Sequence, residues 1–321
     1  MGNASAKKAK AADGVVDSKT AAGAPETPPR TTPRSVPKPT EEAQLKDPGW
    51  HGLGACCAAC LSAAQQAQLR KLLLDSQLRQ LHRARITPFN PDGTAQHTWL
   101  LRSIWRNLRP TESFVRKGNA WKAVGFQGSD PATDVRGGGL LAVQCLEHFC
   151  DVHAAGMRTM IEQLEVVNAA SAERFYPIST TAIVVCCKLC DLLGLSDGVR
   201  GPISAEALET LLATSRRHLA TLLVPWGRRG GFFGLFSLLM ADVHTRFIRS
   251  RATYMAVQKL LTKVFEDLDR RAQGCRLFQE LSDLYCADVD VAALLAHART
   301  PRTPRSSTET PRSSTPGSST S

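Results

Sequence analysis

The chain is most distinctive at residues 121–146, which read WKAVGFQGSDPATDVRGGGLLAVQCL. From residue 110 to Gly138 there is no 3.6-residue apolar repeat, whereas leucine-rich periodic segments lie on both sides. A loop of this length inside a helical domain is commonly functional. Arg136 is followed directly by three glycines, which tolerate unusual backbone dihedrals and let another backbone or a ligand come close. The sequence therefore predicts a helical fold built around a functional loop that contains Arg136.

Apolar side chains recur at helical spacing on both sides of this loop. Residues 183–195 are nearly all apolar and predict a buried central helix. Strand-like alternation is nearly absent, so we predict an all-α fold, a single multi-helix domain, with Gly194 and Gly230 at helix ends or turns. The predicted core-facing residues are Leu69, Leu72, Leu73 and Leu81; Leu100, Leu101, Ile104, Trp105 and Leu108; Leu140, Val143 and Leu146; and Tyr254, Val257, Leu261, Val264, Phe265 and Leu268.

Composition divides the chain into three parts. Residues 1–47 contain hardly an aliphatic cluster, and residues 298–321 repeat Thr-Pro-Arg before they become Ser and Thr. Neither part can bury enough apolar area to offset the entropy of ordering, so we expect a disordered basic N-terminal tail and a disordered C-terminal tail. The helical domain is expected at residues 48–297. The Thr-Pro pairs of the C-terminal tail fit either phosphorylation sites or a simple solvated tail.

The net charge of +11 is spread unevenly: the two tails carry +2 and +3, and the domain carries +6. In the domain the basic residues are mixed with acidic ones, and no zinc-finger or RNP motif occurs. We therefore expect no nucleic-acid partner. A mildly basic protein suits an anionic membrane surface or an acidic face of a protein partner.

Two features of the sequence concern membranes. No apolar stretch is long and uninterrupted enough to cross about 30 Å of hydrocarbon. Residues 1–8, MGNASAKK, resemble an N-myristoylation signal with Gly2 as acceptor, and an acyl chain beside lysines can hold a protein on a membrane. The pattern departs at Ala6, where Ser or Thr is usual, so a plain disordered start is the alternative. Without a secretory signal, we expect a cytoplasmic protein, peripheral on membranes if Gly2 is acylated.

The cysteines form two C-x-x-C patterns, at residues 57–60 and 187–190. Four such thiolates could in principle bind one zinc ion. Both patterns lie in apolar, helix-like surroundings, where cysteine behaves as a small apolar residue. We therefore expect Cys187 and Cys190 to pack in the core, with no metal and no cofactor, whereas the first group could also carry reversible acylation.

The loop resembles the signature of the engulfment and cell motility (ELMO) domain family. The likeness covers about residues 60–275, and it departs from the family pattern at Val135 and Val143, which both keep the apolar character. Nine positions at fixed spacing make this signature far more specific than a short motif. The matching residues are Trp121, Gly125, Phe126, Gln127, Pro131, Thr133, Asp134, Arg136 and Gly139, followed by Leu146.

The resemblance implies an activity through Arg136. Short, single-domain members of the family activate GTP hydrolysis by small GTPases of the Arf and Arf-like group, and the arginine of the signature is regarded as an arginine finger. Arg136 occupies that position. A planar guanidinium can bridge two of the oxygens that gain charge when the γ-phosphate is transferred. The partner GTPase would supply GTP and Mg²⁺, so this chain would be an activator in trans and not itself a hydrolase.

Three other signature residues have structural interpretations. Trp121 and Phe126 are expected to anchor the loop to the core. Pro131 is expected at the first position of a short helical turn capped by Ser129 or Asp130.

The remaining polar residues have roles that the sequence leaves open. Thr133 and Asp134 are expected to hold the loop and to orient the guanidinium of Arg136. Gln127 either buttresses the loop or touches the GTPase. For Arg136 itself, the alternative is a structural ion pair with Asp130 or Asp134.

Two other functions are compatible with the resemblance. The long members of the family are scaffolds that pair with exchange factors for Rac-type GTPases and do not accelerate hydrolysis. They carry armadillo-like repeats and a pleckstrin-homology module, for which 321 residues have no room, so we expect the short type. A membrane-tethered adaptor that only binds a GTPase is the third possibility, and it would not need Arg136.

Overall fold

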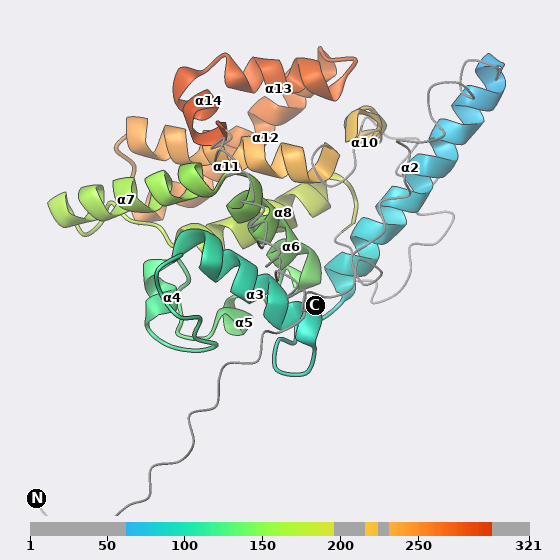
Figure 1. Cartoon of the computed structure of the whole chain (residues 1–321). Helices are drawn as coiled ribbons and strands as arrows, with labels where there is room; N and C mark the ends of the chain where they lie inside the picture. The colour runs from blue at the N-terminus through green and yellow to red at the C-terminus, as the bar shows by residue number, and fades with distance from the viewer. Residues whose placement is uncertain (1–61, 196–215, 224–230, 297–321) are drawn as a thin grey trace, which may run out of the picture. The chain divides into compact units, whose positions relative to one another are not determined.

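The computed structural model describes residues 62–195, 216–223 and 231–296 (Figure 1). The chain divides into two units, Met1–Thr40 and Glu41–Ser321, and every described residue belongs to the second. Gly2, the first cysteine group, Gly230 and both predicted tails lie outside the described residues.

All regular elements of the described residues are helical, which confirms the all-α prediction. They are α2 (Ala63–Ile86), α3 (Ala95–Leu108), α4 (Ala120–Ala123), α5 (Pro131–Asp134), α6 (Gly139–Val152), α7 (Ala154–Ala170), α8 (Ile178–Leu192), α10 (Arg216–Leu223), α11 (Gly231–Arg249), the 3-10 helix η2 (Tyr254–Ala256), α12 (Val257–Gln273), α13 (Phe278–Cys286) and α14 (Val289–Leu295). No described helix is long and apolar enough to cross a membrane.

The core is built around α6, which packs against α2, α3, α7, α8 and α11 (Figure 1). Leu141, Cys145 and Phe149 are fully buried on α6, and this helix has almost no exposed face. Only Asp151 of α6 is exposed, and the polar Gln144, Glu147 and His148 are buried with the apolar side chains, because helices cover α6 on nearly all sides. The loop after α3 meets the start of α8, where the Ser179 amide donates to the Gly125 carbonyl.

The predicted central helix at residues 183–195 is confirmed as α8, which begins earlier, at Ile178. Its apolar side chains are buried against α6 and α11. Gly194 has a φ of 66° just after the end of α8, a backbone conformation that favours glycine, so the predicted helix end at Gly194 is also confirmed.

The prediction of a buried side chain is wrong at two positions, Leu72 and Tyr254. Leu72 is 57% exposed, and the neighbouring Leu74 and Leu78 are buried instead. Several consecutive leucines fit more than one helical stripe, and the packing of α2 on α6 selects the stripe that contains Leu74. Tyr254 is 51% exposed because it lies in η2, ahead of the amphipathic helix α12 whose buried face begins at Val257.

Candidate functional site

Aromatic side chains fasten the loop between α3 and α6 to the core. Trp121 is fully buried and Phe126 is 3% exposed. The Trp121 ring meets that of Trp105 at 4.9 Å and that of Phe126 at 5.4 Å, both edge to face. The indole Nε1 of Trp121 donates to the Val115 carbonyl at 3.0 Å, so its polar group is satisfied as well. Trp121 and Phe126 lie where anchors of the loop are expected.

Gly125 joins the loop to the first turn of α8. Its carbonyl accepts from the Ser179 amide at 2.9 Å, and the Ser179 hydroxyl donates to the Val124 carbonyl at 2.6 Å. A Cβ at Gly125 would lie 2.3 Å from Cγ2 of Ile178, and the φ of Gly125 is 90°. Only glycine satisfies both the contact and the backbone conformation.

Asp134, the last residue of α5, holds three parts of the structure together. Its Oδ2 accepts from the Gln127 amide at 2.7 Å and from the Thr180 hydroxyl at 3.2 Å. The Thr133 hydroxyl donates to the Asp130 carbonyl at 2.8 Å and to Asp134 at 3.3 Å. The carboxylate thus links α5 to residues 125–127 and to α8.

Asp130 has a separate set of partners. It caps α5 by accepting from the Ala132 amide at 3.0 Å, with Pro131 in the first turn, as the sequence suggested. It also pairs with Arg116 at 2.7 Å and with Lys117 at 2.9 Å, and Arg116 reaches Asp92 as well. Burial would raise the pKa of Asp130, but hydrogen bonds from these two cations lower it. The sequence contained no signal for this network, because Asp92 and Arg116 lie far apart in the chain.

Arg136 follows the buried Val135, and its own side chain is exposed. Within residues 62–195, 216–223 and 231–296, Arg136 makes no ion pair and no side-chain hydrogen bond. The alternative of a structural ion pair is therefore wrong, since Asp130 and Asp134 are bound to other partners. For the same reason, Thr133 and Asp134 hold the loop but do not orient the guanidinium. Arg136 is thus an exposed guanidinium without a partner in the described part of the chain, on a loop that Asp134 and the buried aromatic side chains hold in place.

The three glycines after Arg136 have different surroundings. A Cβ at Gly139 would lie 2.1 Å from the Arg85 carbonyl, and the φ of Gly139 is 59°. The Leu140 amide donates to the Thr87 carbonyl at 2.9 Å. At Gly137, by contrast, an added Cβ would have nothing within 4 Å. The close approach at Gly139 is therefore made by the end of α2, and Gly137 faces open space.

The second cysteine group lies in and beside the core. Cys186 and Cys190 are buried, as expected for packing, and Cys187 is half-buried. The Cys187 thiol donates to the Gly137 carbonyl at 3.4 Å. Among the described residues, no group of three or more His, Cys, Asp or Glu side chains is placed to hold a metal ion. The alternative of a zinc site shared with the first cysteine group involves residues outside the described part.

A hollow of about 560 Å³ lies beside the loop. Lys122, Phe126 and Gln127 line it from the loop, and Phe175, Pro177 and Tyr254 line it from the segments before α8 and α12. The backbone of Gln127 is tied to Asp134, while its side chain is exposed at this hollow. The backbone amide of Gln127 thus helps to close the loop, and its side chain lies at this hollow.

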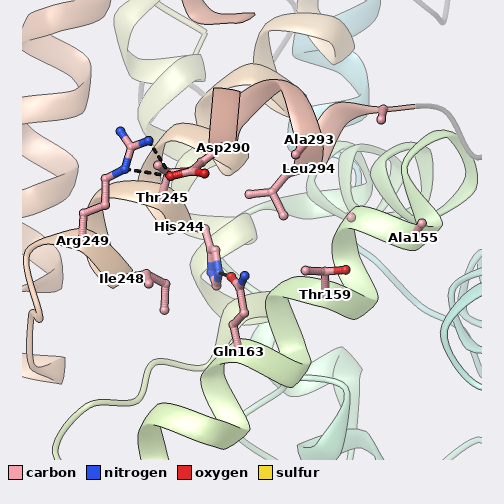
Figure 2. Close-up of a pocket in the computed structure, with 12 residues that line it drawn as sticks. Ala155, Thr159, Gln163, His244, Thr245, Ile248, Arg249, Asp290, Ala293 and Leu294 are labelled. Atoms are coloured by element: carbon pink, nitrogen blue, oxygen red, sulfur yellow. Dashed lines mark hydrogen bonds and ion pairs between the residues drawn. The ribbon is translucent and has the colours of Figure 1, made fainter. Parts of the chain in front are cut away.

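A second pocket, of about 420 Å³, lies among α7, α11 and α14 (Figure 2). Its imidazole, His244, is hydrogen-bonded to Gln163 and to the Tyr176 hydroxyl, both at 2.8 Å. Burial lowers the pKa of His244 to about 4, so the ring is neutral at pH 7. Arg249, at the same pocket, pairs with Asp290. These polar groups satisfy one another and join the three helices.

Comparison with known proteins identifies the family. The model of the ELMO/CED-12 family matches residues 79–261, more than half of the chain. ELMO domain-containing protein 1 of Bos taurus is 36% identical over 110 residues, which cover 34% of this chain and 31% of that protein. ELMO domain-containing protein C of Dictyostelium discoideum is 24% identical over 185 residues, which cover 56% of this chain and 26% of that protein.

A third relative shows the domain in a different setting. The ankyrin repeat and ELMO domain-containing protein D of Dictyostelium discoideum is 31% identical over 99 residues, which cover 31% of this chain and 7% of that protein. The chain thus spans less than a third of the length of these curated relatives. No solved structure matches the chain. The match over residues 79–261 shows that the chain belongs to the ELMO/CED-12 family.

Proposed function

We propose that this protein is a GTPase-activating protein for small GTPases of the Arf and Arf-like group, and that Arg136 is its arginine finger. The observation that carries the proposal is the state of Arg136, which is exposed and has no partner among the described residues, on a loop whose neighbouring residues are buried or hydrogen-bonded. An arginine that enters the site of another protein is best left without an ion pair in its own protein, since the free energy needed to break such a pair would weaken docking.

The loop around Arg136 supports this role physically. Val135, directly before Arg136, is 1% exposed, and Asp134 is tied to the loop and to α8. The backbone that carries the finger is therefore held before the partner arrives, which lowers the entropy lost on docking. The side chain itself stays free to reach the γ-phosphate of a bound nucleotide.

In this proposal, the GTPase and this chain supply different groups to the reaction. The GTPase holds GTP and Mg²⁺, and this chain supplies the guanidinium that stabilises the charge on the transferred phosphoryl group. A finger of this kind accelerates hydrolysis by about 10³-fold to 10⁵-fold. This protein would act as an activator in trans, with no hydrolytic site of its own.

Single-turnover GTP hydrolysis by a panel of Arf and Arf-like GTPases tests the proposal. We expect Arg136→Lys to abolish the stimulated rate while GTPase binding and thermal stability stay near those of the parent protein, because lysine keeps the charge but loses the two-pronged geometry. Arg106→Lys is the matched control, since Arg106 is exposed on α3. Full stimulation by Arg136→Lys would refute the finger and favour a GTPase-binding scaffold or adaptor.

We further propose that the protein works in the cytoplasm at a membrane surface, held there by an acyl chain on Gly2. The sequence at residues 1–8, with a possible acyl acceptor followed by lysines, supports this. Incorporation of labelled myristate, compared between the parent protein and Gly2→Ala, tests it. Equal membrane recovery of the two proteins would count against the anchor.

A further inference from the structure

The hollow of about 560 Å³ beside the loop is assembled from three segments that lie far apart in the chain. The Tyr254 amide donates to the Glu173 carbonyl at 2.9 Å, so η2 is fastened to the segment before α8. The Ser179 amide donates to the Gly125 carbonyl, which fastens the start of α8 to the loop. Backbone hydrogen bonds therefore hold the walls of the hollow together, and a surface held in this way loses little entropy when it binds a partner.

The side chains at the hollow are mainly apolar. Phe126, Phe175 and Pro177 line it, and Phe126 is 3% exposed. Tyr254, which the helical repeat placed in the core, is 51% exposed at the hollow, and the next residue, Met255, is 84% exposed. Tyrosine is enriched among the residues that supply most of the energy of protein binding, and methionine adapts its shape to a partner. Exposed apolar side chains beside a concave apolar surface are typical of a protein interface.

The segments that line the hollow carry an excess of positive charge. Residues 119–127, 172–177 and 251–255 together contain three basic side chains and one acidic side chain. Lys122 lines the hollow itself, is exposed, and makes no ion pair with a carboxylate of the described residues. This charge is complementary to a surface that presents carboxylates around an apolar side chain.

The hollow also adjoins the part of the loop that carries Arg136. Gln127 lines the hollow, and its amide donates to Asp134 at 2.7 Å. Arg136 follows Asp134 by two residues, a span of at most about 7.6 Å along the chain. An interface of ordinary size covers about 800 Å² on each partner, a patch roughly 30 Å across. A protein that docks on Arg136 with such a footprint therefore reaches the hollow as well.

We propose that this hollow is the docking surface for the partner GTPase, which inserts an apolar side chain between Phe126, Phe175 and Tyr254 and places carboxylates beside Lys122. This role rests on the proposed function and deepens it, since Arg136 supplies the charge in the transition state and the hollow supplies affinity. The occupant is a protein and not a membrane, because a concave surface encloses a protruding side chain, which the face of a bilayer does not offer.

Binding to the panel of Arf and Arf-like GTPases, each loaded with a non-hydrolysable GTP analogue, tests this surface without turnover. In the full chain, we expect Tyr254→Ala to weaken binding by about 10-fold or more, and Tyr254→Phe, which keeps the ring, to bind like the parent protein. Leu277→Ala is the matched control, since Leu277 is 58% exposed ahead of α13 and should leave the dissociation constant unchanged. The melting temperature of each variant shows whether it is folded.

The charge at the hollow gives a second test. We expect Lys122→Glu to weaken binding by about 10-fold at low salt and by less at high salt, because salt screens the interaction of exposed charges. Arg276→Glu is the control, since it reverses an exposed cation next to Leu277. Equal losses of affinity in Lys122→Glu and Arg276→Glu, or in Tyr254→Ala and Leu277→Ala, would overturn the docking surface. The absence of binding to every GTPase of the panel would overturn it too.

Kinetics separate the docking surface from the proposed function. When the concentration of the GTPase is varied, Tyr254→Ala should raise KM and leave kcat near the parent value, whereas Arg136→Lys should lower kcat. If GTPases bind in a way that depends on Tyr254 but the parent protein stimulates none of them, the proposed function fails and the docking surface stands. If stimulation depends on Arg136 while KM is unchanged in Tyr254→Ala and Lys122→Glu, the docking surface fails and the finger stands.

Vesicles that contain anionic lipid distinguish the GTPase from a membrane as the occupant. We expect Tyr254→Ala and Leu277→Ala to bind such vesicles equally well. If Tyr254→Ala and Lys122→Glu lose affinity for the vesicles and keep the parent affinity for GTPases, the hollow contacts a membrane and the docking surface is refuted.

Discussion

The glycine turn after Arg136 offers a test in which two neighbouring substitutions should differ sharply. In Gly139→Ala, the new Cβ would lie 2.1 Å from the Arg85 carbonyl oxygen and 3.0 Å from the Thr87 carbonyl oxygen, at a φ of 59°. A left-handed backbone costs a non-glycine residue about 1 to 2 kcal/mol. Relief of the overlap adds about 1 to 3 kcal/mol, and loss of the bond from Leu140 to Thr87 adds about 1 kcal/mol.

We therefore expect Gly139→Ala to lower the free energy of unfolding by about 3 to 6 kcal/mol, a large part of the stability of an ordinary domain. Gly137→Ala is the matched control, because Gly137 has no positive φ and its Cβ would meet nothing within 4 Å. It should change the unfolding free energy by less than about 1 kcal/mol. Urea unfolding followed by circular dichroism measures both variants. Equal stabilities of Gly139→Ala and Gly137→Ala would refute the close packing of α2 on this turn.

Two other predictions concern stability. Asp134→Asn removes the charged acceptor of the Gln127 amide and the Thr180 hydroxyl. We expect the free energy of unfolding to fall by about 2 kcal/mol and the melting temperature by roughly 5 °C. The control Asp151→Asn, at an exposed carboxylate, should change both little. Calorimetry decides, and a matching loss in both variants would contradict the role given to Asp134. His244 has its pKa lowered to about 4 by burial, so the unfolded chain binds more protons between about pH 6.5 and pH 4, and stability should fall by up to about 3 kcal/mol as the pH falls through this range. The slope of unfolding free energy against pH should be shallower in His244→Gln, and identical slopes would show that other groups cause the effect.

Part of the candidate site could be predicted from local sequence. Loss of the helical repeat marked the loop, and the Asp-Pro pair marked the start of α5 at Pro131. Trp121 and Phe126 were expected in the core because large aromatic side chains between helices seldom stay in water, and both are buried. These features depend on neighbours within a few residues, so a single sequence contains the information for them.

The partners of the charged residues could not be predicted in this way. Asp130 was within reach of Arg136 along the chain, yet it pairs with Arg116 and Lys117, and Asp134 binds Thr180, forty-six residues away. The sequence contains several basic residues that could each pair with such a carboxylate. Only the folded chain decides which of them comes near. Arg136 has no ion pair among the described residues, and these two carboxylates bind other groups instead.

The sequence by itself determined that this chain is helical, where the long loop lies and which arginine that loop presents, because helical periodicity and glycine conformation are local properties. The tertiary structure alone decided which leucine stripe of α2 faces α6 and that the end of α2 packs on Gly139. Contacts between helices depend on shape and packing over long separations in the chain, and the order of residues along one segment does not contain them.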